Sequence, residues 1–351
     1  MRWITFAEAV NEALRQSMEY DKNVIAYGLG IDDPKRVFGT TRNLKELFGG
    51  GRVFDMPTSE NAMTGMAIGA ALNGLRPIMT HQRLDFFLLA MDQLVNNAAK
   101  WHYMFGGEAA VPITIRLIIG RGWGQGPTHS QNLQAWFAHV PGLKVVMPST
   151  AYDAKGLLLA SIFDDNPVLF LEHRWLHELK GEVPEEIYRV PIGKAQRLKE
   201  GKNITIVSFS YMTIEALHAV EVLNRQGVSV DLIDLRSIKP IDWEMIFDSV
   251  RKTGRLLAVD TGPIRCCVAG DIVAHVAAKC FGSLKEAPQV LACPDCPTPT
   301  SLALTWAFYR RAEDIVASVG KILKKPLSTE ELRKERHHSH DVPGEWFKGP
   351  F

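Results

Sequence analysis

The chain has 351 residues, of which 46% are hydrophobic and 23% are charged. A chain of this length can bury a sizeable core and is expected to form two domains. Forty basic and 39 acidic side chains give a formal net charge of +1. This balance lacks the positive excess typical of proteins that bind nucleic acids or anionic membranes, so small molecules or other proteins are the expected partners.

Signals for membrane insertion or export are not evident in the sequence. No apolar run reaches the roughly 18 residues that a membrane span needs. The first ten residues lack the cationic-then-apolar order of a signal peptide. We therefore expect a cytoplasmic or organelle-matrix protein with no membrane partner.

The five cysteines all fall between residues 266 and 296, which is a poor disulfide framework for a chain of this length. The last two form a C-x-x-C pattern with Cys293 and Cys296. This pattern occurs in metal and redox sites, but no second ligand pair stands at zinc spacing and a proline follows each cysteine. A structural loop is the favoured interpretation.

The first domain is predicted to be α/β with a mainly parallel sheet and to cover residues 1–176. Residues 4–18 have apolar positions at helical spacing, and Thr5 and Glu8 form a capping-box pattern at their start. Alternation of apolar runs with helical stretches then predicts a βα repeat. The predicted strands lie in residues 23–30, 76–82, 111–120, 143–148 and 168–173, and the predicted helices begin near Ala62, Phe87, Gln131 and Tyr152.

A polar segment broken by Pro and Gly, residues 177–202, is the expected linker. Residues 203–326 repeat the strand–helix–strand pattern, with Gly227 as a helix stop, and predict a second α/β domain. The tail, 327–351, is polar and is expected to wrap a partner or to remain mobile. Its histidines could ligate a metal, although a solvated role is the simpler one for a terminal segment: His337, His338 and His340.

Glu60 stands between a Pro-Thr-Ser turn and a helix built almost wholly from small residues. Gly65 and Gly69, four positions apart, leave one stripe of this helix nearly without side chains. Glycine costs a helix interior about 1 kcal/mol relative to alanine, so the stripe indicates that another backbone packs closely there. That backbone could belong to the same chain or to a second subunit.

A glycine-rich loop delivers His129 just before a helix. Its glycines never satisfy the dinucleotide-binding pattern G-x-G-x-x-G: Gly120, Gly122, Gly124 and Gly126. A loop histidine held in this way can act as a general acid or base near neutral pH. An ordinary surface or capping role would produce the same pattern.

Three polar or aromatic residues follow the strand predicted at 76–82 or lie at its end. His81 and Gln82 occupy the carboxyl end of the strand, where α/β sheets place ligands. Phe86 could present its ring to a flat heterocycle, although core packing explains it equally well.

Several long blocks resemble the β subunit of thiamine-diphosphate-dependent 2-oxo acid dehydrogenase E1 components, which are transketolase-like and include pyruvate, branched-chain 2-oxo acid and acetoin dehydrogenases. The blocks are residues 52–79, 90–107, 126–158, 164–173 and 228–242. The resemblance covers roughly residues 4–320. It implies an N-terminal domain that binds the cofactor's aminopyrimidine and a C-terminal transketolase-type domain.

By this resemblance, Glu60 hydrogen-bonds an aminopyrimidine nitrogen and is a catalytic residue. The acid favours the imino tautomer, whose nitrogen removes the thiazolium C2 proton so that the carbanion can attack a 2-oxo group. The resemblance implies that this acid is enclosed, and the small residues behind it are expected to provide the enclosure. The resemblance also assigns Phe86 to the aminopyrimidine pocket and His129 to proton or acyl transfer. Thr58 and Gln82 are expected as further cofactor contacts, and His81 with His129 as substrate contacts.

The resemblance also implies metals and partners. The family binds diphosphate and Mg²⁺ through a G-D-G motif of the α subunit, which is missing here, so an α partner in an α2β2 assembly is expected. A lipoyl acyltransferase is a further expected partner. In some members backbone carbonyls hold a structural K⁺ at positions that match Ile113, Ser161, Asp164 and Asn166.

The chain departs from the family pattern at two acids, which are replaced by Leu29 and Thr80. Family accounts assign such acids to proton communication between paired sites. The expected function is decarboxylation of a 2-oxo acid followed by acyl or aldehyde transfer. Two alternatives remain open: a split transketolase or acyloin-forming subunit without a lipoyl partner, and a non-catalytic scaffold subunit.

Overall fold

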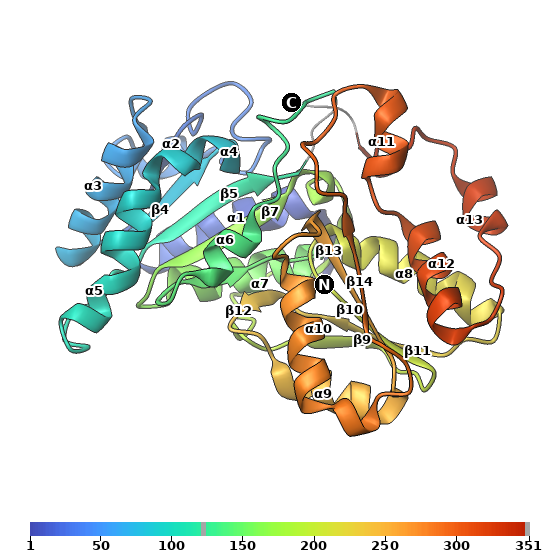
Figure 1. The fold of residues 1–351 in the computed structure, drawn as a ribbon. Helices are drawn as coiled ribbons and strands as arrows, with labels where there is room; N and C mark the ends of the chain where they lie inside the picture. The colour runs from blue at the N-terminus through green and yellow to red at the C-terminus, as the bar shows by residue number, and fades with distance from the viewer. Residues whose placement is uncertain (121–123, 348–351) are drawn as a thin grey trace. The chain divides into compact units, whose positions relative to one another are not determined.

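The computed structural model describes residues 1–120 and 124–347, which divide into two compact units. The first unit contains residues 1–120 and 128–192, and the second contains residues 124–127 and 193–347 (Figure 1). The expected linker 177–202 is therefore shared, because its first part completes one unit and its last part begins the other.

The elements of the first unit alternate strands with helices for most of its length. They are β1 (Arg2–Thr5), α1 (Phe6–Tyr20), β2 (Val24–Gly28), α2 (Leu44–Phe48), β3 (Val53–Asp55), α3 (Glu60–Leu72), β4 (Arg76–His81), α4 (Leu84–Phe87), the short helical turns η1 (Leu88–Ala90) and η2 (Gln93–Ala98), α5 (Ala99–Met104), β5 (Thr114–Ile119), α6 (Gln134–His139), β6 (Lys144–Val146), α7 (Ala151–Ile162), β7 (Val168–His173), η3 (Arg174–Leu176) and β8 (Lys180–Val183).

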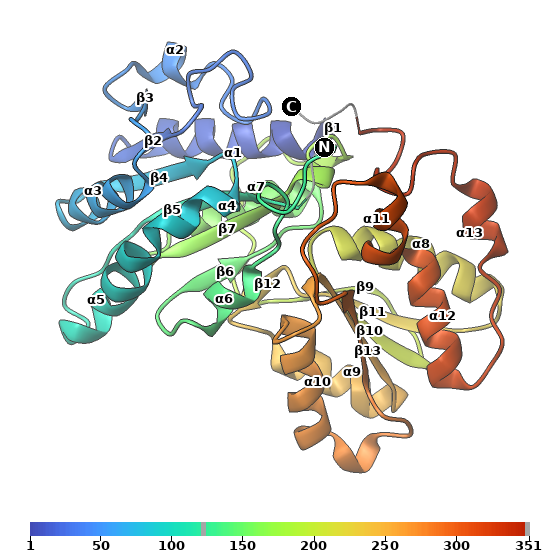
Figure 2. The ribbon, with the colours of Figure 1, turned by 45° about the horizontal axis from the view of Figure 1, so that its top comes forward.

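A parallel sheet forms the centre of this unit, as the sequence predicted. Its strands follow the order β6-β7-β5-β4-β2-β3, and every pair among them is parallel. Helices α1 and α7 lie side by side against it (Figure 2). Strands β1 and β8 form a small antiparallel sheet, which holds the last strand of the unit beside its first strand.

The capping box predicted at the start of α1 is confirmed. The backbone N–H of Glu8 donates to the Thr5 hydroxyl over 3.1 Å, and the Glu8 carboxylate accepts from the Thr5 backbone N–H over 2.7 Å. The reciprocal pair satisfies backbone donors that a helix start leaves open. The apolar face of α1 is buried, in agreement with the helical spacing.

Two predicted helix starts differ from the structure. The helix expected near Phe87 begins at Leu84, and the helix expected near Gln131 begins at Gln134. In the second case Gln131 is not free to enter the helix because its backbone N–H and side chain both donate to Asp85. Such a long-range bond leaves no trace in local periodicity.

The second unit repeats the strand–helix alternation. Its elements are β9 (Gln196–Lys199), β10 (Ile204–Ser208), α8 (Tyr211–Arg225), β11 (Val230–Asp234), β12 (Ser237–Lys239), α9 (Trp243–Thr253), β13 (Leu256–Pro263), α10 (Val268–Lys279), η4 (Phe281–Ser283), β14 (Gln289–Cys293), α11 (Leu302–Phe308), α12 (Ala312–Leu323) and α13 (Glu330–Glu335).

A five-stranded sheet with the order β14-β13-β10-β11-β9 forms the core of the second unit. It is parallel except for β9 at one edge, which runs antiparallel to β11. Helices α8 and α12 cover one face, and α9 and α10 cover the other (Figures 1 and 2). Gly227, with φ of +76°, ends α8 as the sequence predicted.

The described part of the tail packs on the second unit, and its expected contact with a partner or mobility stays a prediction. Arg311 is buried and donates to the backbone carbonyls of His340 and Val342. The same guanidinium bonds Glu215 over 2.8 Å and Tyr211 over 2.6 Å. One buried arginine therefore ties the tail to α8 and α12.

Replacing Arg311 with methionine should free the tail, because the substitution leaves Glu215 buried without its cation. Breaking a buried pair in this way costs about 3–5 kcal/mol. Hydrogen exchange should accelerate in residues 336–347, and urea should unfold the variant at lower concentration. The double variant Arg311→Met/Glu215→Leu is the control, and it should recover part of the lost stability. Unchanged exchange in the tail would contradict the role given to Arg311.

Candidate active site

The expected site residues leave the sheet of the first unit at one edge. Glu60 follows β3, Gln82 and Phe86 follow β4, and His129 follows β5. These strands belong to the run β5-β4-β2-β3, in which all pairs are parallel. The carboxyl ends of parallel strands share one edge of a sheet, which is where α/β proteins bind ligands.

Glu60 is the first residue of α3 and is only 5% exposed. Its position at a helix start is favourable for a carboxylate, because the backbone N–H groups there are oriented toward it. The hydroxyl of Thr64 donates to the Glu60 carbonyl over 2.9 Å and fixes the first turn. The acid is therefore held by backbone geometry and enclosed, as the sequence predicted.

The small-residue stripe of α3 does not account for that enclosure. The buried residues next to Glu60 are Met63, Thr64 and Ala67. A methyl group added at Gly69 would meet no atom within 4 Å, and one added at Gly65 would make an ordinary contact with Gln93 at 3.5 Å. Neither glycine is in close contact with another described part of the chain, and packing of this stripe against a second subunit stays a prediction.

Phe86 and His129 meet edge to face. Their ring centroids lie 5.3 Å apart with an interplanar angle of 85°. The Phe86 side chain is 37% exposed, and the Nδ1 atom of His129 lies 3.0 Å from the hydroxyl of Thr128. An exposed aromatic ring beside an exposed histidine can cover a flat ligand and present an imidazole to it.

The loop that carries His129 is fixed at both ends. At its start, Gly120 has φ of +75°, and a methyl group there would lie 2.4 Å from the His173 ring, so only glycine fits. At its end, Gln131 donates from Nε2 to Asp85 over 2.8 Å. Gly122 lies outside the described residues. Sequence reasoning missed Asp85, although its place directly before Phe86 was a usable signal.

His81 is fully buried at the end of β4. Its ring packs on Phe87 with centroids 5.0 Å apart, and neither ring nitrogen has a hydrogen-bond partner among the described residues. Burial lowers the pKa of His81 to about 4. The side chain is therefore a neutral core group in this chain, and its predicted substrate role stays a prediction.

Gln82 and Thr58 differ in how they are held. Gln82 donates from Nε2 to Asp33 over 3.3 Å, and a methyl group at Gly30 would lie 2.0 Å from the same nitrogen. Gln82 thus packs directly over the backbone of the loop after β2. Thr58 is exposed in the turn before α3. The cofactor role predicted for both residues stays a prediction.

A buried polar network lies beneath the strand ends. Arg116 makes two bonds to Glu172, at 2.7 and 3.0 Å, and approaches the Thr80 hydroxyl at 3.4 Å. Burial raises the pKa of Glu172, but Arg116 and His177 together outweigh burial and hold that pKa below its usual range. His177 Nε2 lies 3.3 Å from Glu172. Thr80, at the position where a family acid was expected, therefore faces Arg116, which already has Glu172 as its counter-ion.

The carbonyl positions suggested for K⁺ lie near one another. The Ile113 carbonyl accepts from the N–H of Val168 over 3.0 Å, which brings it beside the loop that contains Asp164. The guanidinium of Arg76 already donates to the Asp164 carbonyl over 3.0 Å. The potassium site stays a prediction for Ile113, Ser161, Asp164 and Asn166.

Over residues 1–120 and 124–347, no group of three His, Cys, Asp or Glu side chains is placed to hold a metal ion. In that same part of the chain no helix is long and apolar enough to cross a bilayer. All five cysteines are free thiols: Cys266, Cys267, Cys280, Cys293 and Cys296.

Comparison with known proteins identifies both units. The family model described as "Transketolase, pyrimidine binding domain" matches residues 2–178, and "Transketolase, C-terminal domain" matches residues 193–315. The β subunit of acetoin:2,6-dichlorophenolindophenol oxidoreductase of Cupriavidus necator is 41% identical over 333 residues, which cover 92% of this chain and 98% of that protein. The chain belongs to the family of E1 β subunits.

Other members of the E1 β family are nearly as similar. The pyruvate dehydrogenase E1 component subunit beta of Rickettsia felis is 40% identical and covers 91% of this chain and 98% of its own. The 2-oxoisovalerate dehydrogenase subunit beta of Bacillus subtilis is 40% identical, with 85% and 91% covered. A solved "Split gene transketolase, inactive beta4 tetramer" has a TM-score of 0.74 at 23% identity, covering 92% of this chain and 99% of its own, and shares the fold.

Replacing His81 with phenylalanine should make the protein less sensitive to acid. The folded state protonates His81 only near pH 4, whereas an unfolded histidine takes up a proton below about pH 6.5. The unfolded state therefore binds more protons between these values, and stability falls as pH falls. At pH 5 the free energy of unfolding is lowered by about 2 kcal/mol in the parent protein. The variant should not show this decrease.

Urea unfolding at pH 7 and pH 5 measures this difference. The control is His218→Phe, on the exposed side of α8, which should retain the acid sensitivity of the parent protein. Equal losses in His81→Phe and the parent protein would show that His81 does not stay neutral when folded.

Proposed function

We propose that the chain is the catalytic β subunit of a thiamine-diphosphate-dependent 2-oxo acid dehydrogenase of E1 type. It would work with an α subunit in an α2β2 assembly. The observation that carries the proposal is the buried acid Glu60 at the start of α3, in a unit that matches the pyrimidine-binding domain. A chain with only a scaffolding role has no need of an enclosed acid at this position.

The residues present fit the aminopyrimidine half of the cofactor. Glu60 offers a protected carboxyl group that can hold a proton at a ring nitrogen. The exposed ring of Phe86 offers an apolar surface for the heterocycle. When bound, thiamine diphosphate supplies the nucleophilic carbon that attacks a 2-oxo group and accepts the electron pair released on decarboxylation.

His129 is the residue proposed to move a proton near the reacting atoms. Its ring is anchored by Thr128 and by the edge of Phe86 but is open to solvent. An imidazole in this setting can donate or accept a proton near neutral pH. Asp85 acts only as a positioning residue, because it holds Gln131 and with it the end of the His129 loop.

The α subunit is proposed to supply Mg²⁺ and the diphosphate site. The relatives are named as β subunits, and this chain lacks the G-D-G motif. Acetoin, pyruvate and 2-oxoisovalerate, from the names of relatives, are the donors to test first. A lipoyl acyltransferase and a structural K⁺ are proposed as further components on the family pattern alone.

Glu60→Gln should reduce turnover of the α–β complex by about 100-fold or more, because a positioned acid contributes this much to proton transfer. The assay follows reduction of 2,6-dichlorophenolindophenol with each donor, with thiamine diphosphate and Mg²⁺ present. Ketol formation from aldehydes, measured in parallel, distinguishes a transketolase-like transfer from oxidation.

The matched control is Glu19→Gln, on the exposed side of α1, which should leave turnover unchanged. Calorimetric titration of thiamine diphosphate into the complex adds a second readout, because the glutamine variant should also bind the cofactor more weakly. Full turnover and full cofactor affinity in Glu60→Gln would support the scaffold alternative and overturn this mechanism.

A further inference from the structure

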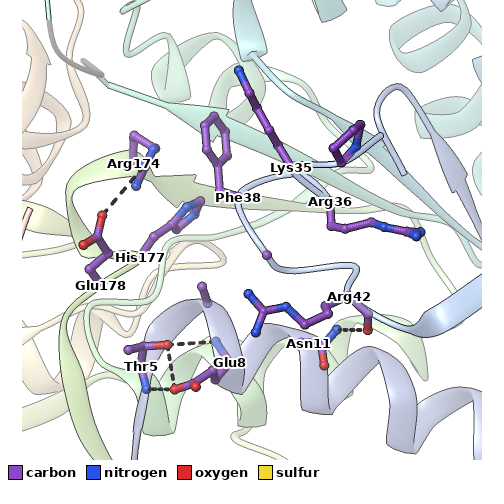
Figure 3. Close-up of a pocket in the computed structure, with 13 residues that line it drawn as sticks. Thr5, Glu8, Asn11, Lys35, Arg36, Phe38, Arg42, Arg174, His177 and Glu178 are labelled. Carbon is purple, nitrogen blue, oxygen red and sulfur yellow. Dashed lines mark hydrogen bonds and ion pairs between the residues drawn. The ribbon is translucent and has the colours of Figure 1, made fainter. Parts of the chain in front are cut away.

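A second pocket in the first unit is not used by the proposed function. It has a volume of about 450 Å³ and lies among the loop 34–42, the start of α1 and the segment after β7 (Figure 3). Its size is within the range of small-molecule sites, roughly 300–1,000 Å³. More cationic than acidic side chains line the pocket, which favours the binding of an anion.

The loop 34–42 is shaped by left-handed backbone. Arg36, Val37 and Phe38 have φ of 49°, 47° and 59°, a region that non-glycine residues adopt rarely. This turn sends Arg36 outward, where it pairs with Asp32 and Glu46, and it sends the ring of Phe38 into the pocket (Figure 3). The loop thus presents an aromatic face to whatever occupies the pocket.

Phe38 lies between two buried arginines. The guanidinium of Arg174 is 4.3 Å from its ring centroid, and that of Arg83 is 5.9 Å away. Burial lowers the pKa of each arginine to about 10, and the charge of Arg83 lowers that of Arg174 further. Arg174 pairs with Glu178 over 3.9 Å. An anion bound near two buried guanidinium groups lowers the free-energy cost of keeping both charges in the interior.

His177 contributes an unsatisfied polar atom to the same wall. Its side chain is 1% exposed, and its ring lies 5.7 Å from Phe38. Nε2 lies 3.3 Å from Glu172, and neither ring nitrogen meets the geometric criteria for a hydrogen bond with a described residue. Buried polar atoms almost always have a partner, so an open nitrogen at a pocket wall indicates a ligand or a water.

Arg42 supplies an exposed charge at the mouth of the pocket. Its guanidinium extends over α1, and it forms no ion pair or side-chain hydrogen bond with any described residue (Figure 3). Glu8 lies below it, but this carboxylate accepts two bonds from Thr5 as part of the helix cap, which lowers its pKa. Arg42 and Arg174 both line the pocket, so an anion bound in it has two guanidinium groups available as donors.

We propose that this pocket binds a small metabolite through an oxyanion, a carboxylate or a phosphate, held between Arg42 and Arg174 with its apolar part against Phe38. Guanidinium groups bind both oxyanions with paired hydrogen bonds, and an aromatic face favours a ligand with a nonpolar portion. The proposal does not depend on the activity of the Glu60 site.

Calorimetric titration of the full-length chain tests the proposal with two probes, inorganic phosphate and malonate, each without thiamine diphosphate. At least one should bind in the millimolar range or tighter, and the stronger of the two identifies the oxyanion. Arg42→Gln should weaken that binding about 10-fold or more, the loss of one charge-assisted pair. Arg42→Lys, which keeps the charge, should lose less.

Arg15→Gln is the matched control, because Arg15 is an exposed arginine of α1 outside the pocket. It should bind the probe as the parent chain does, and circular dichroism verifies that every variant is folded. Absence of binding by both probes at 10 mM, about a tenfold excess over a millimolar constant, overturns the proposal. Binding that is equal in Arg42→Gln and the parent chain places the anion elsewhere and overturns it as well.

Discussion

The buried ion pair between Arg116 and Glu172 supports both functional regions of the first unit. Two bonds join the side chains across β5 and β7, with neither side chain exposed to solvent. Each charge is tolerated in the interior only because the other is present. On one side the pair meets Thr80, near the strand ends from which the Glu60 site is built, and on the other it meets His177 of the anion pocket.

The two principal residues of the proposed active site are held in different ways. Glu60 is the first residue of a helix and is buried. His129 is exposed and depends on contacts at the ends of its loop. An enclosed acid suits a cofactor that stays bound through every catalytic cycle. An exposed imidazole on a loop suits a substrate whose shape changes as it reacts.

Local sequence predicted the parts of the structure that local forces decide. The cap at Thr5, the helix stop at Gly227 and the parallel βα repeat all follow from residues close together in the chain. The polar residues at the ends of β4 and β5 were found because strand ends are where ligands bind. The resemblance to a family then assigned roles to Glu60 and Phe86 that spacing could not.

What escaped prediction depends on pairs distant in sequence. Arg116 and Glu172 are 56 residues apart, and Arg311 meets a carbonyl of the tail 29 residues away. In the sequence alone, nothing distinguished these residues from ordinary charged side chains. The glycines of α3 were noticed in the sequence, but no described part of this chain packs closely against them.

The contact between Gly30 and Gln82 limits how this protein can vary. A side chain at position 30 would occupy the space that the Gln82 amide now fills. The restriction runs in one direction, although 51 positions lie between the two residues: a side chain at position 30 requires the Gln82 amide to move or to be replaced, whereas a shorter residue at position 82 leaves Gly30 unaffected. A chimera that imports a loop with a side chain at position 30 therefore needs a smaller residue at position 82, and in an evolving sequence position 82 has to change first.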